Sequence, residues 1–306
     1  MAGNIDLHTH TMYSDGGLTP NQLVVKAKEV GLKAIALTDH DNIAATEVAM
    51  LKGKELGVEV IPAIELTAYL DENSDVNDLH ILGYFIDPRD RELRKKLEFY
   101  QKEREDKSRK VVKNLNALGY KLEFNEVKKL AKGTIAGPHI AFLIISKKDN
   151  EALLTKEFGK IPETGEFIQK YLVIGGPAYE ARVAATPKEA IDLIHQAGGL
   201  AILAHPCWNL AEKDGKKLIF NDKVISDLVS LGLDGIEVYA HRENEADTKK
   251  CVEHFEKVAA KLKLVVSGGS DFHDFGSAGK DLGFEGFYLK VPYSVLENLK
   301  KRLKVS

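Results

Sequence analysis

The sequence lacks several features that would place the chain in a specialised class of protein. It has only two cysteines, Cys207 and Cys251, and no apolar run approaches the ~20 residues needed to span a bilayer. Two cysteines so far apart form neither a disulfide framework nor a zinc-thiolate pattern, so we expect two free thiols, with Cys251 packed on a helix. The first predicted strand begins by Ile5, which leaves no room for a signal peptide. These absences argue against membrane insertion and favour a cytoplasmic protein.

An excess of charge of one sign is also missing. Charged residues make up 29% of the 306 residues, yet the net charge is only −3. The overall charge balance therefore does not demand a nucleic-acid or membrane-surface partner. The sequence contains no internal repeat and no low-complexity tract. Its length suits one large α/β domain, or a core domain that carries an insertion.

What the sequence does contain is an alternation of predicted strands and helices. Their apolar periodicity and their Thr-Pro and Gly boundaries predict, in order, a strand ending at His8 and His10, a helix from Thr19-Pro20 to Gly31, a strand at Ala34–Leu37, a helix at Ile43–Leu56 and a strand at Val58–Ile64. This βαβ alternation predicts a parallel sheet or barrel. A hairpin should follow, with strands at 66–70 and 79–85 on either side of a turn at 71–78.

The middle of the chain has a different character. Residues 89–118 are dense in charge, with apolar positions that suit one long helix or two shorter ones, and helical patterns continue to about Tyr171. We therefore predict a helical insertion or cap domain at 96–185 and a discontinuous barrel domain at 1–95 and 186–306. The βαβ pattern resumes after a helix start at Thr186-Pro187, with predicted strands at 200–203, 235–239 and 264–267.

Side chains that bind transition metals lie at or near the predicted strand ends. His8 and His10, at i and i+2, should point to one face of the first strand, and Asp15 returns to its mouth in a turn. The carboxyl ends of strands in α/β folds form the face where sites are built. The full set of candidate ligands is His8, His10, Asp15, His40, Glu65, His80, His205, Asp271 and His273. This number exceeds the four or five ligands of one ion, so we predict more than one metal, with Glu65 as the best bridge.

Together these motifs resemble those of the PHP (polymerase and histidinol phosphatase) superfamily over nearly the whole chain. The branch most similar to this chain contains 3′,5′-nucleoside bisphosphate phosphatases and 5′-3′ exoribonucleases. The resemblance implies a distorted (β/α)7 barrel with a helical insertion domain, and a centre of two or three divalent ions (Mn, Fe or Zn). The segments that carry it are Asp6–His10, Thr38–Asp41, Glu65, His80–Tyr84, Pro138–Ala141, His205-Pro206 and Gly269–His273.

The resemblance also implies how the ligands are divided and which residues meet the substrate. One metal would take His8, His10, Glu65 and Asp271, a second would take Glu65, His80 and His205, and a third would take Asp15, His40 and His273. Arg104, Lys107 and His139 would bind the substrate phosphate, although Lys107 and Gly137 stand where the family usually has Arg. His139 or a metal-bound water would act as the acid, while His139 could also be a helix residue without a role. His241 lies either at the mouth or in a surface loop, and His195 and His254 receive no function.

These implications lead to the expectation of a metal-dependent phosphoric ester hydrolase. A hydroxide bridging the metals would attack the phosphorus of a nucleoside 3′,5′-bisphosphate, a nucleoside monophosphate or the 5′ end of a short oligonucleotide. Histidinol-phosphate phosphatase is the alternative within the superfamily. Hydrolysis of C–N bonds is disfavoured, because that class generally has a lysine where this chain has Glu65. An accessory or interaction module without turnover is the alternative from another class.

Overall fold

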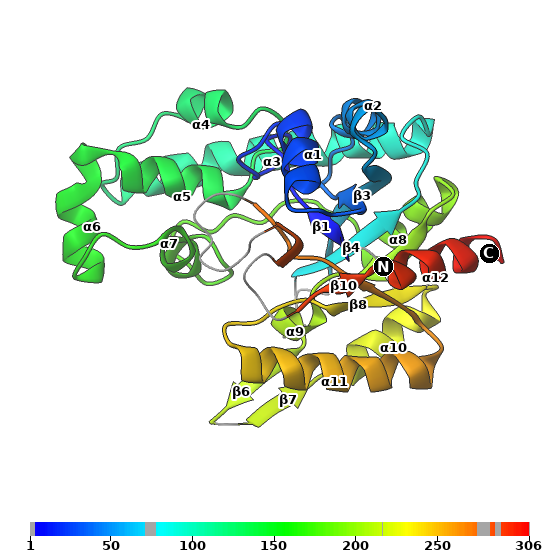
Figure 1. Ribbon diagram of the computed structural model, residues 1–306. Helices are drawn as coiled ribbons and strands as arrows, with labels where there is room; N and C mark the ends of the chain where they lie inside the picture. Colours follow the sequence, from blue (N-terminus) through cyan, green and yellow to red (C-terminus); the bar gives the residue numbers. More distant parts are fainter. Residues whose placement is uncertain (1–3, 71–77, 216, 274–281, 285–288, 306) are drawn as a thin grey trace.

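The computed structural model describes residues 4–70, 78–215, 217–273, 282–284 and 289–305, and an eight-stranded sheet lies at its centre (Figure 1). The strand order is β10-β1-β2-β3-β4-β5-β8-β9. The chain after β9 returns to β1, where the His10 N–H donates to the Phe272 carbonyl at 2.8 Å, so the sheet curls into a barrel. This confirms the predicted α/β barrel. The strands are β1 (Asn4–Thr9), β2 (Ala34–Leu37), β3 (Glu59–Tyr69), β4 (Asp78–Tyr84), β5 (Leu200–Leu203), β8 (Gly235–Tyr239), β9 (Val265–Gly268) and β10 (Val291–Pro292).

Two strands of the sheet run against their neighbours: the edge strand β10 is antiparallel to β1, and β4 is reversed in the middle of the sheet. The β1, β2 and β3 strands are parallel, as are β5, β8 and β9, whereas β4 is antiparallel to both β3 and β5. The reversal brings the start of β4, and with it His80, to the edge where the other strands end. The β3 strand is one continuous element that contains Glu65, so the separate strands predicted at 58–64 and 66–70 are wrong. Residues 71–77 of the turn predicted at 71–78 lie outside the described residues, and Asp78 belongs to β4.

An irregularity in β1 decides where its histidines point. Asp6 pairs with Ile35 and Thr9 pairs with Leu37, so three steps along β1 match two steps along β2. Such a bulge interrupts the alternation of side chains between the two faces of a strand. Leu7 packs in the apolar cluster inside the barrel, and His8, the next residue, also points inward, with Nδ1 3.1 Å from a carboxylate oxygen of Glu237.

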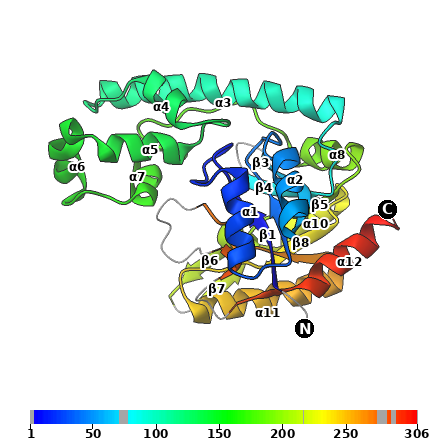
Figure 2. The same ribbon diagram turned by 45° about the horizontal axis from the view of Figure 1, so that its top comes forward.

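Helices cover the outside of the barrel (Figure 2). Apolar residues of β2 and β3 pack against α1 and α2. Thr19 and Thr186 cap α1 and α8, as predicted. The α2 helix begins at Thr46, later than predicted, because the Asn42 side chain accepts the Ala44 N–H and holds a loop there. No described helix combines the length and the apolar character needed to cross a bilayer. The covering helices are α1 (Pro20–Glu29), α2 (Thr46–Leu56), α8 (Pro187–Gln196), α10 (Asp222–Ser230), α11 (Glu245–Leu262) and α12 (Tyr293–Leu303), and short elements are α9 (Pro206–Asn209), η2 (Leu282–Phe284) and the hairpin β6 (Ala211–Asp214) with β7 (Lys217–Phe220).

A single long helix, α3 (Arg91–Ala117), joins the barrel to the remaining helices (Figure 2). Its first half buries Leu93 and Leu97 in the core outside the barrel, together with α8. Its second half buries Val111 and Leu115 in a separate core shared with the helices that follow. The helix therefore belongs to both cores, and the division of the chain at residue 96 stays a prediction. The helices that follow are α4 (Phe124–Leu130), α5 (Gly137–Ser146), η1 (Lys148–Asn150), α6 (Glu151–Phe158) and α7 (Thr164–Tyr171).

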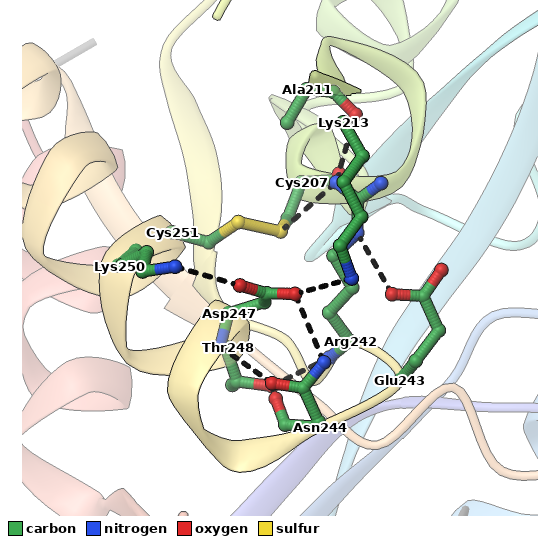
Figure 3. Close-up of a disulfide and its surroundings, with 10 residues drawn as sticks. All are labelled: Cys207, Ala211, Lys213, Arg242, Glu243, Asn244, Asp247, Thr248, Lys250 and Cys251. Carbon is green, nitrogen blue, oxygen red and sulfur yellow. Dashed lines mark hydrogen bonds and ion pairs between the residues drawn. A yellow bond between two sulfur atoms is a disulfide. The ribbon is translucent and has the colours of Figure 1, made fainter. Parts of the chain in front are cut away.

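The two cysteines form a disulfide, so the expectation of two free thiols is wrong (Figure 3). Cys207 lies on α9 and Cys251 on α11, and their Cα atoms are 5.7 Å apart. Both side chains are buried. The Arg242 guanidinium donates to the carbonyl oxygens of Cys207 and Ala211, and these bonds hold the α9 turn against the segment that leads into α11. Spacing along the chain could not show this contact, because it depends on how the two helices pack.

Reduction of this disulfide is expected to lower the free energy of unfolding by up to about 4 kcal/mol, because the bond closes a loop across 44 positions of the sequence. The measurement is urea denaturation of the purified protein with and without dithiothreitol. A variant carrying both Cys207→Ser and Cys251→Ser is the control, and the reductant should not change its stability. Titration of two thiols in the unfolded, unreduced protein would contradict the bond.

Candidate metal centre

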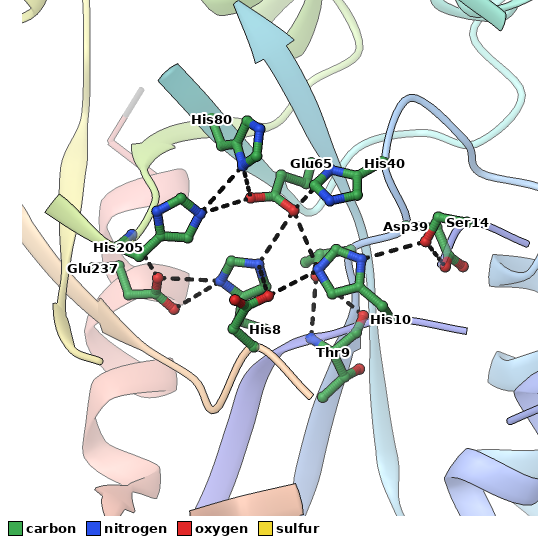
Figure 4. Close-up of polar contacts among 12 residues, drawn as sticks. His8, Thr9, His10, Ser14, Asp39, His40, Glu65, His80, His205 and Glu237 are labelled. Carbon is green, nitrogen blue, oxygen red and sulfur yellow. Dashed lines mark hydrogen bonds and ion pairs between the residues drawn. The ribbon is translucent and has the colours of Figure 1, made fainter. Parts of the chain in front are cut away.

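The nine predicted ligands converge at one end of the barrel, where β1, β2, β5 and β9 finish, Glu65 projects from β3 and the reversed β4 begins. Figure 4 shows the imidazoles of His8, His10, His40, His80 and His205 around the Glu65 carboxylate. The cluster contains four groups of side chains, and within each group the imidazole and carboxylate ligand atoms lie within 4.8 Å of one another. The groups are His10, Asp15, His40 and His273; His8, His10 and Asp271; His8, Glu65 and His205; and His40, Glu65 and His80. Residues from both ends of the sequence thus share one cluster.

The Glu65 carboxylate lies at the middle of this cluster and is fully buried. Its Oε2 atom is 3.3 Å from His8 Nε2, 3.2 Å from His10 Nε2 and 3.1 Å from His40 Nδ1. Its Oε1 atom is 2.9 Å from His80 Nδ1 and 3.2 Å from His205 Nε2. Each oxygen therefore faces a different set of imidazoles, which is the arrangement that a bridging carboxylate requires.

Asp271 and Asp15 complete the carboxylate set on either side of His10. Asp271 Oδ1 lies 3.3 Å from His8 Nε2 and 3.2 Å from His10 Nε2. Asp15 Oδ1 lies 3.4 Å from His273 Nε2 and 3.9 Å from His40 Nε2. Asp271 thus supplies a carboxylate beside His8 and His10, and Asp15 supplies one beside His40 and His273.

These residues fit divalent transition ions by three independent observations. Imidazole with carboxylate is a donor set suited to Zn, Mn or Fe. The separations between donor atoms are close to the ~3.4 Å expected for two ligands that each lie ~2.1 Å from one tetrahedral ion. Buried donor atoms also lack a hydrogen-bond partner, which is costly unless something else satisfies them. Within the cluster, the atoms without a partner are His8 Nε2, His10 Nε2, Asp15 Oδ1, His40 Nδ1, Glu65 Oε2 and His205 Nδ1.

The charge states of the cluster point the same way. Burial opposes the charged form of His10, but the carboxylates of Asp271 and Glu65 outweigh it and raise the pKa of His10 to about 10. Burial raises the pKa of Glu65, yet the surrounding imidazoles outweigh that effect and hold the pKa of Glu65 well below its usual range. Burial lowers the pKa of His40 to about 3, which keeps its imidazole neutral. The carboxylates thus favour a bound proton on His10. Metal ions bound to the same ligands would displace such a proton.

Several buried carboxylates that hold the ligands in place were not predicted. Glu237 faces His8 Nδ1, and Asp39 accepts the Ser14 hydroxyl at 2.6 Å, which in turn lies 3.3 Å from His10 Nδ1. Asp6 accepts the backbone and side-chain donors of Ser270 at 2.9 and 2.6 Å, and so ties β1 to the segment that carries Asp271. Asp6 and Asp39 stand inside motifs identified in the sequence, and that position was the available signal. Glu237 has no such signal.

Three non-glycine residues of this region have positive φ angles: Asp41 at 48°, His205 at 28° and Asp271 at 53°. Such conformations are strained for these residue types and persist where surrounding contacts enforce them. His205 and Asp271 are predicted ligands, and Asp41 directly follows His40. Three of the turns that deliver or follow ligands therefore have a strained backbone.

A pocket of about 760 Å³ opens beside the cluster, between the barrel and the inserted helices. Asp15, His40 and His80 line one end of it. The predicted substrate residues Arg104 and Lys107 also line it, and so does Arg182, which was not predicted. The stretch around Arg182 has no periodicity or motif that would have identified it.

The two arginines share one carboxylate. Arg104 Nε lies 2.7 Å from Asp41 Oδ2 and its Nη2 donates to the Thr67 hydroxyl at 2.6 Å, while Arg182 Nη2 lies 3.5 Å from the same Asp41 oxygen. Burial raises the pKa of Asp41, but the charges of Arg104 and Arg182 outweigh it and leave the pKa below its usual value. Asp41 therefore holds both guanidinium groups at the wall of the pocket.

The far wall of the pocket is apolar. Gly137 lies at this wall, where a Cβ atom would meet Leu172 and Ile168 only at ordinary contact distances of 3.7 and 3.8 Å. Because Gly137 stands where an arginine was expected, space remains in the pocket beside the apolar side chains of Leu172 and Ile168. The apolar lining residues are Val111, Ile135, Ile140, Ile168, Leu172, Val173 and Ile174.

His139 has contacts that differ from the predicted substrate contact. It is 3% exposed, its Nδ1 accepts the Ala136 N–H at 3.1 Å, and its neighbours Pro138 and Ile140, but not His139, line the pocket. Burial lowers the pKa of His139 and so favours its neutral imidazole, whereas a general acid must carry a proton that it can donate. Its roles as acid and phosphate ligand stay predictions. Other histidines are placed elsewhere: His241 is buried beside Trp208, and His195 and His254 pair with Asp234 and Asp222.

Comparison with known proteins gives consistent matches. The family model described as PHP domain matches residues 6–170. A 5′-3′ exoribonuclease of Haemophilus influenzae is 31% identical over 274 residues, which cover 89% of this chain and 91% of the relative. A 3′,5′-nucleoside bisphosphate phosphatase of Chromobacterium violaceum is 29% identical over 283 residues, 92% of this chain and 90% of the relative. A crystal structure from Bifidobacterium adolescentis, assigned as a metal-dependent phosphoesterase, has a TM-score of 0.78 at 25% identity and covers 99% of this chain and 97% of its own.

Proposed function

Because the chain belongs to the PHP domain family, we propose that it is a metal-dependent phosphoesterase that removes phosphate from a nucleotide or from the 5′ end of a short oligonucleotide. The single observation that carries this proposal is the position of the cluster. Nine ligand-type side chains lie beside a pocket that also presents Arg104, Lys107 and Arg182. One site thus contains both the ligands that can bind metal ions and the basic side chains that can bind phosphate oxygens.

We propose that all nine residues are metal ligands and that Glu65 is shared between ions. Divalent ions bound in such a cluster lower the pKa of water and neutralise phosphate oxygens. The residues of the chain hold these ions through neutral imidazoles and ionised carboxylates, and the buried setting of His8, His10 and Glu65 excludes bulk water from them. In a buried, preorganised site, fixed charges stabilise the negative charge on the phosphoryl oxygens in the transition state more strongly than they would in water.

The pocket supplies the remaining contacts. Arg104 and Arg182 would donate to phosphate oxygens that face away from the cluster, and Asp41 keeps both groups oriented. Lys107, 5.3 Å from the centre of the Tyr179 ring, adds a third cation. The apolar wall around Leu172 would pack against the nucleoside that leaves. A substrate with both an anionic end and a flat apolar end matches this division, which favours nucleotides over small phosphorylated alcohols.

The proposal is tested by phosphate release from a panel of esters together with metal analysis of the purified protein. The panel contains nucleoside monophosphates, nucleoside 3′,5′-bisphosphates, short 5′-phosphorylated oligonucleotides and histidinol phosphate. We expect a divalent chelator to abolish release and added Mn²⁺ to restore it. We also expect a nucleotide to exceed histidinol phosphate in kcat/KM by roughly tenfold or more, since burial of an apolar group contributes ~1.5 to 3 kcal/mol.

The other candidate functions give different results in the same assay. A preference for histidinol phosphate would assign the chain to that branch of the superfamily. Metal-loaded, folded protein that releases no phosphate from any ester would refute the enzyme and favour an interaction module.

A further inference from the structure

One of the buried carboxylates behind the cluster, Glu237, contacts two of the predicted ligands without belonging to the cluster. Glu237 lies in β8 and is 1% exposed. It is not a member of any of the groups that could hold an ion among the described residues. Its two oxygens both lie 3.1 Å from His8 Nδ1, and Oε2 accepts the backbone N–H of His205 at 2.8 Å (Figure 4).

The contact with His8 decides which ring nitrogen carries a proton. An ionised carboxylate can only accept hydrogen bonds, so His8 Nδ1 must donate to Glu237. The neutral imidazole then has its free lone pair on Nε2, the atom that faces Glu65 and Asp271 at 3.3 Å each. A carboxylate behind a ligating histidine fixes the ring and raises its basicity.

The contact with His205 acts on the backbone instead. His205 has a φ of 28°, so its backbone needs support from its surroundings. The β5 and β8 strands are parallel, with Leu203 opposite Ile236, which brings Glu237 to the level of the turn that follows β5. One side chain thus holds two residues that meet at Glu65.

We propose that Glu237 is a positioning residue of the metal centre, which presents His8 in the metal-binding tautomer and holds the turn that carries His205. This inference rests on the proposed metal centre. Glu237→Gln should weaken metal binding, because an amide can accept through only one atom and its NH₂ group would face one of the two donors. Loss of such a partner typically costs 10- to 100-fold in metal affinity.

The chain offers a matched control at the opposite end of the same strand pair. Asp234 also joins a histidine to a β5 amide: its Oδ2 lies 2.7 Å from His195 Nε2 and accepts the Ala201 N–H at 3.0 Å. His195 is not one of the clustered residues. Asp234→Asn therefore removes the same kind of contact away from the cluster.

The experiment measures Zn²⁺ affinity by competition with a chromophoric chelator, and bound metal per chain after dialysis, for the parent and both variants. We expect E237Q to lose about 10- to 100-fold in the affinity of at least one ion and D234N to keep the parental affinity. Parental affinity in folded E237Q, or an equal loss in D234N, would overturn the inference. If E237Q does not fold, Glu237→Asp replaces it, because it keeps the charge but cannot reach both donors, and parental affinity there also overturns the inference. A parent that binds no metal would instead refute the proposed function.

Discussion

A Glu65→Gln variant is expected to lose phosphate release by about 10³-fold or more and to bind less metal, the largest effect that one substitution in this chain should have. Glu65 is the only carboxylate of the described residues that approaches five of the clustered histidines, at 2.9 to 3.3 Å. Glutamine keeps its volume but removes the charge and turns an NH₂ group toward imidazoles whose lone pairs must face an ion. The loss should therefore appear in kcat and in the metal content together.

The control for this variant lies on the same strand. Glu59 begins β3 at the far end from the cluster, where it accepts the Tyr293 hydroxyl at 2.6 Å and pairs with Lys300. Glu59→Gln should lower stability slightly and leave kcat and the bound metal unchanged. Metal content and phosphate release are measured for both variants under saturating Mn²⁺. An E65Q variant that retains parental turnover, or an E59Q variant that loses it, would show that the cluster around Glu65 is not the active site.

The position of most candidate ligands follows from one rule that sequence alone can apply. Strands of an α/β fold share an edge at their carboxyl ends, so polar residues that end separate strands meet there. His10, His40 and His205 follow this rule, and the structure brings them to the same edge. Predicted strand positions at Ala34–Leu37, Leu200–Leu203 and Gly235–Tyr239 were confirmed without change, since short buried strands bounded by turn residues have few alternative readings.

The reversed strand and the bulge show where the same reasoning has limits. His80 starts its strand, and only the antiparallel pairing of β4 brings it to the cluster. His8 points inward beside the inward-facing Leu7, which strict alternation along β1 would not allow. Alternation along the first strand correctly placed His8 and His10 on one face, but it could not show that Leu7 lies on the same side. His80 was a candidate ligand although no predicted strand end placed it at the site.

Three contacts between distant segments could not be predicted from the sequence. Glu237 reaches His8 because β5 and β8 are neighbours in the sheet, and Arg182 reaches Asp41 because the chain returns from the inserted helices to the barrel. The Cys207–Cys251 bond depends on how α9 packs against α11. Each of these contacts is set by tertiary packing, and at least one partner in each of them, namely Glu237, Arg182 or the cysteines, carries no periodic or motif signal.

Arg104→Met is expected to reduce kcat/KM for the best nucleotide by about 10²-fold, with the metal content unchanged. The guanidinium of Arg104 is held by Asp41 and Thr67 at the pocket wall, so its charge is already oriented there when a phosphate binds. Loss of one preorganised donor to a developing anion typically costs ~2.7 kcal/mol or more, which is about 10²-fold. Asp41 keeps Arg182 as a partner at 3.5 Å, so the variant should fold.

Two further variants separate this role from a general effect of charge. Arg109 lies on the same helix, but it is exposed and pairs with Glu105 beside the Phe124 ring, so Arg109→Met should leave kcat/KM unchanged. Arg182→Met should resemble R104M, because both guanidiniums meet the same Asp41 oxygen. The double variant should lose less than the product of the two single losses if both arginines bind one phosphate group, since residues that act on one group are not additive. Equal kcat/KM in R104M and R109M would place the substrate phosphate elsewhere in the pocket, and a fall in metal content of R104M would assign the arginine to the cluster instead.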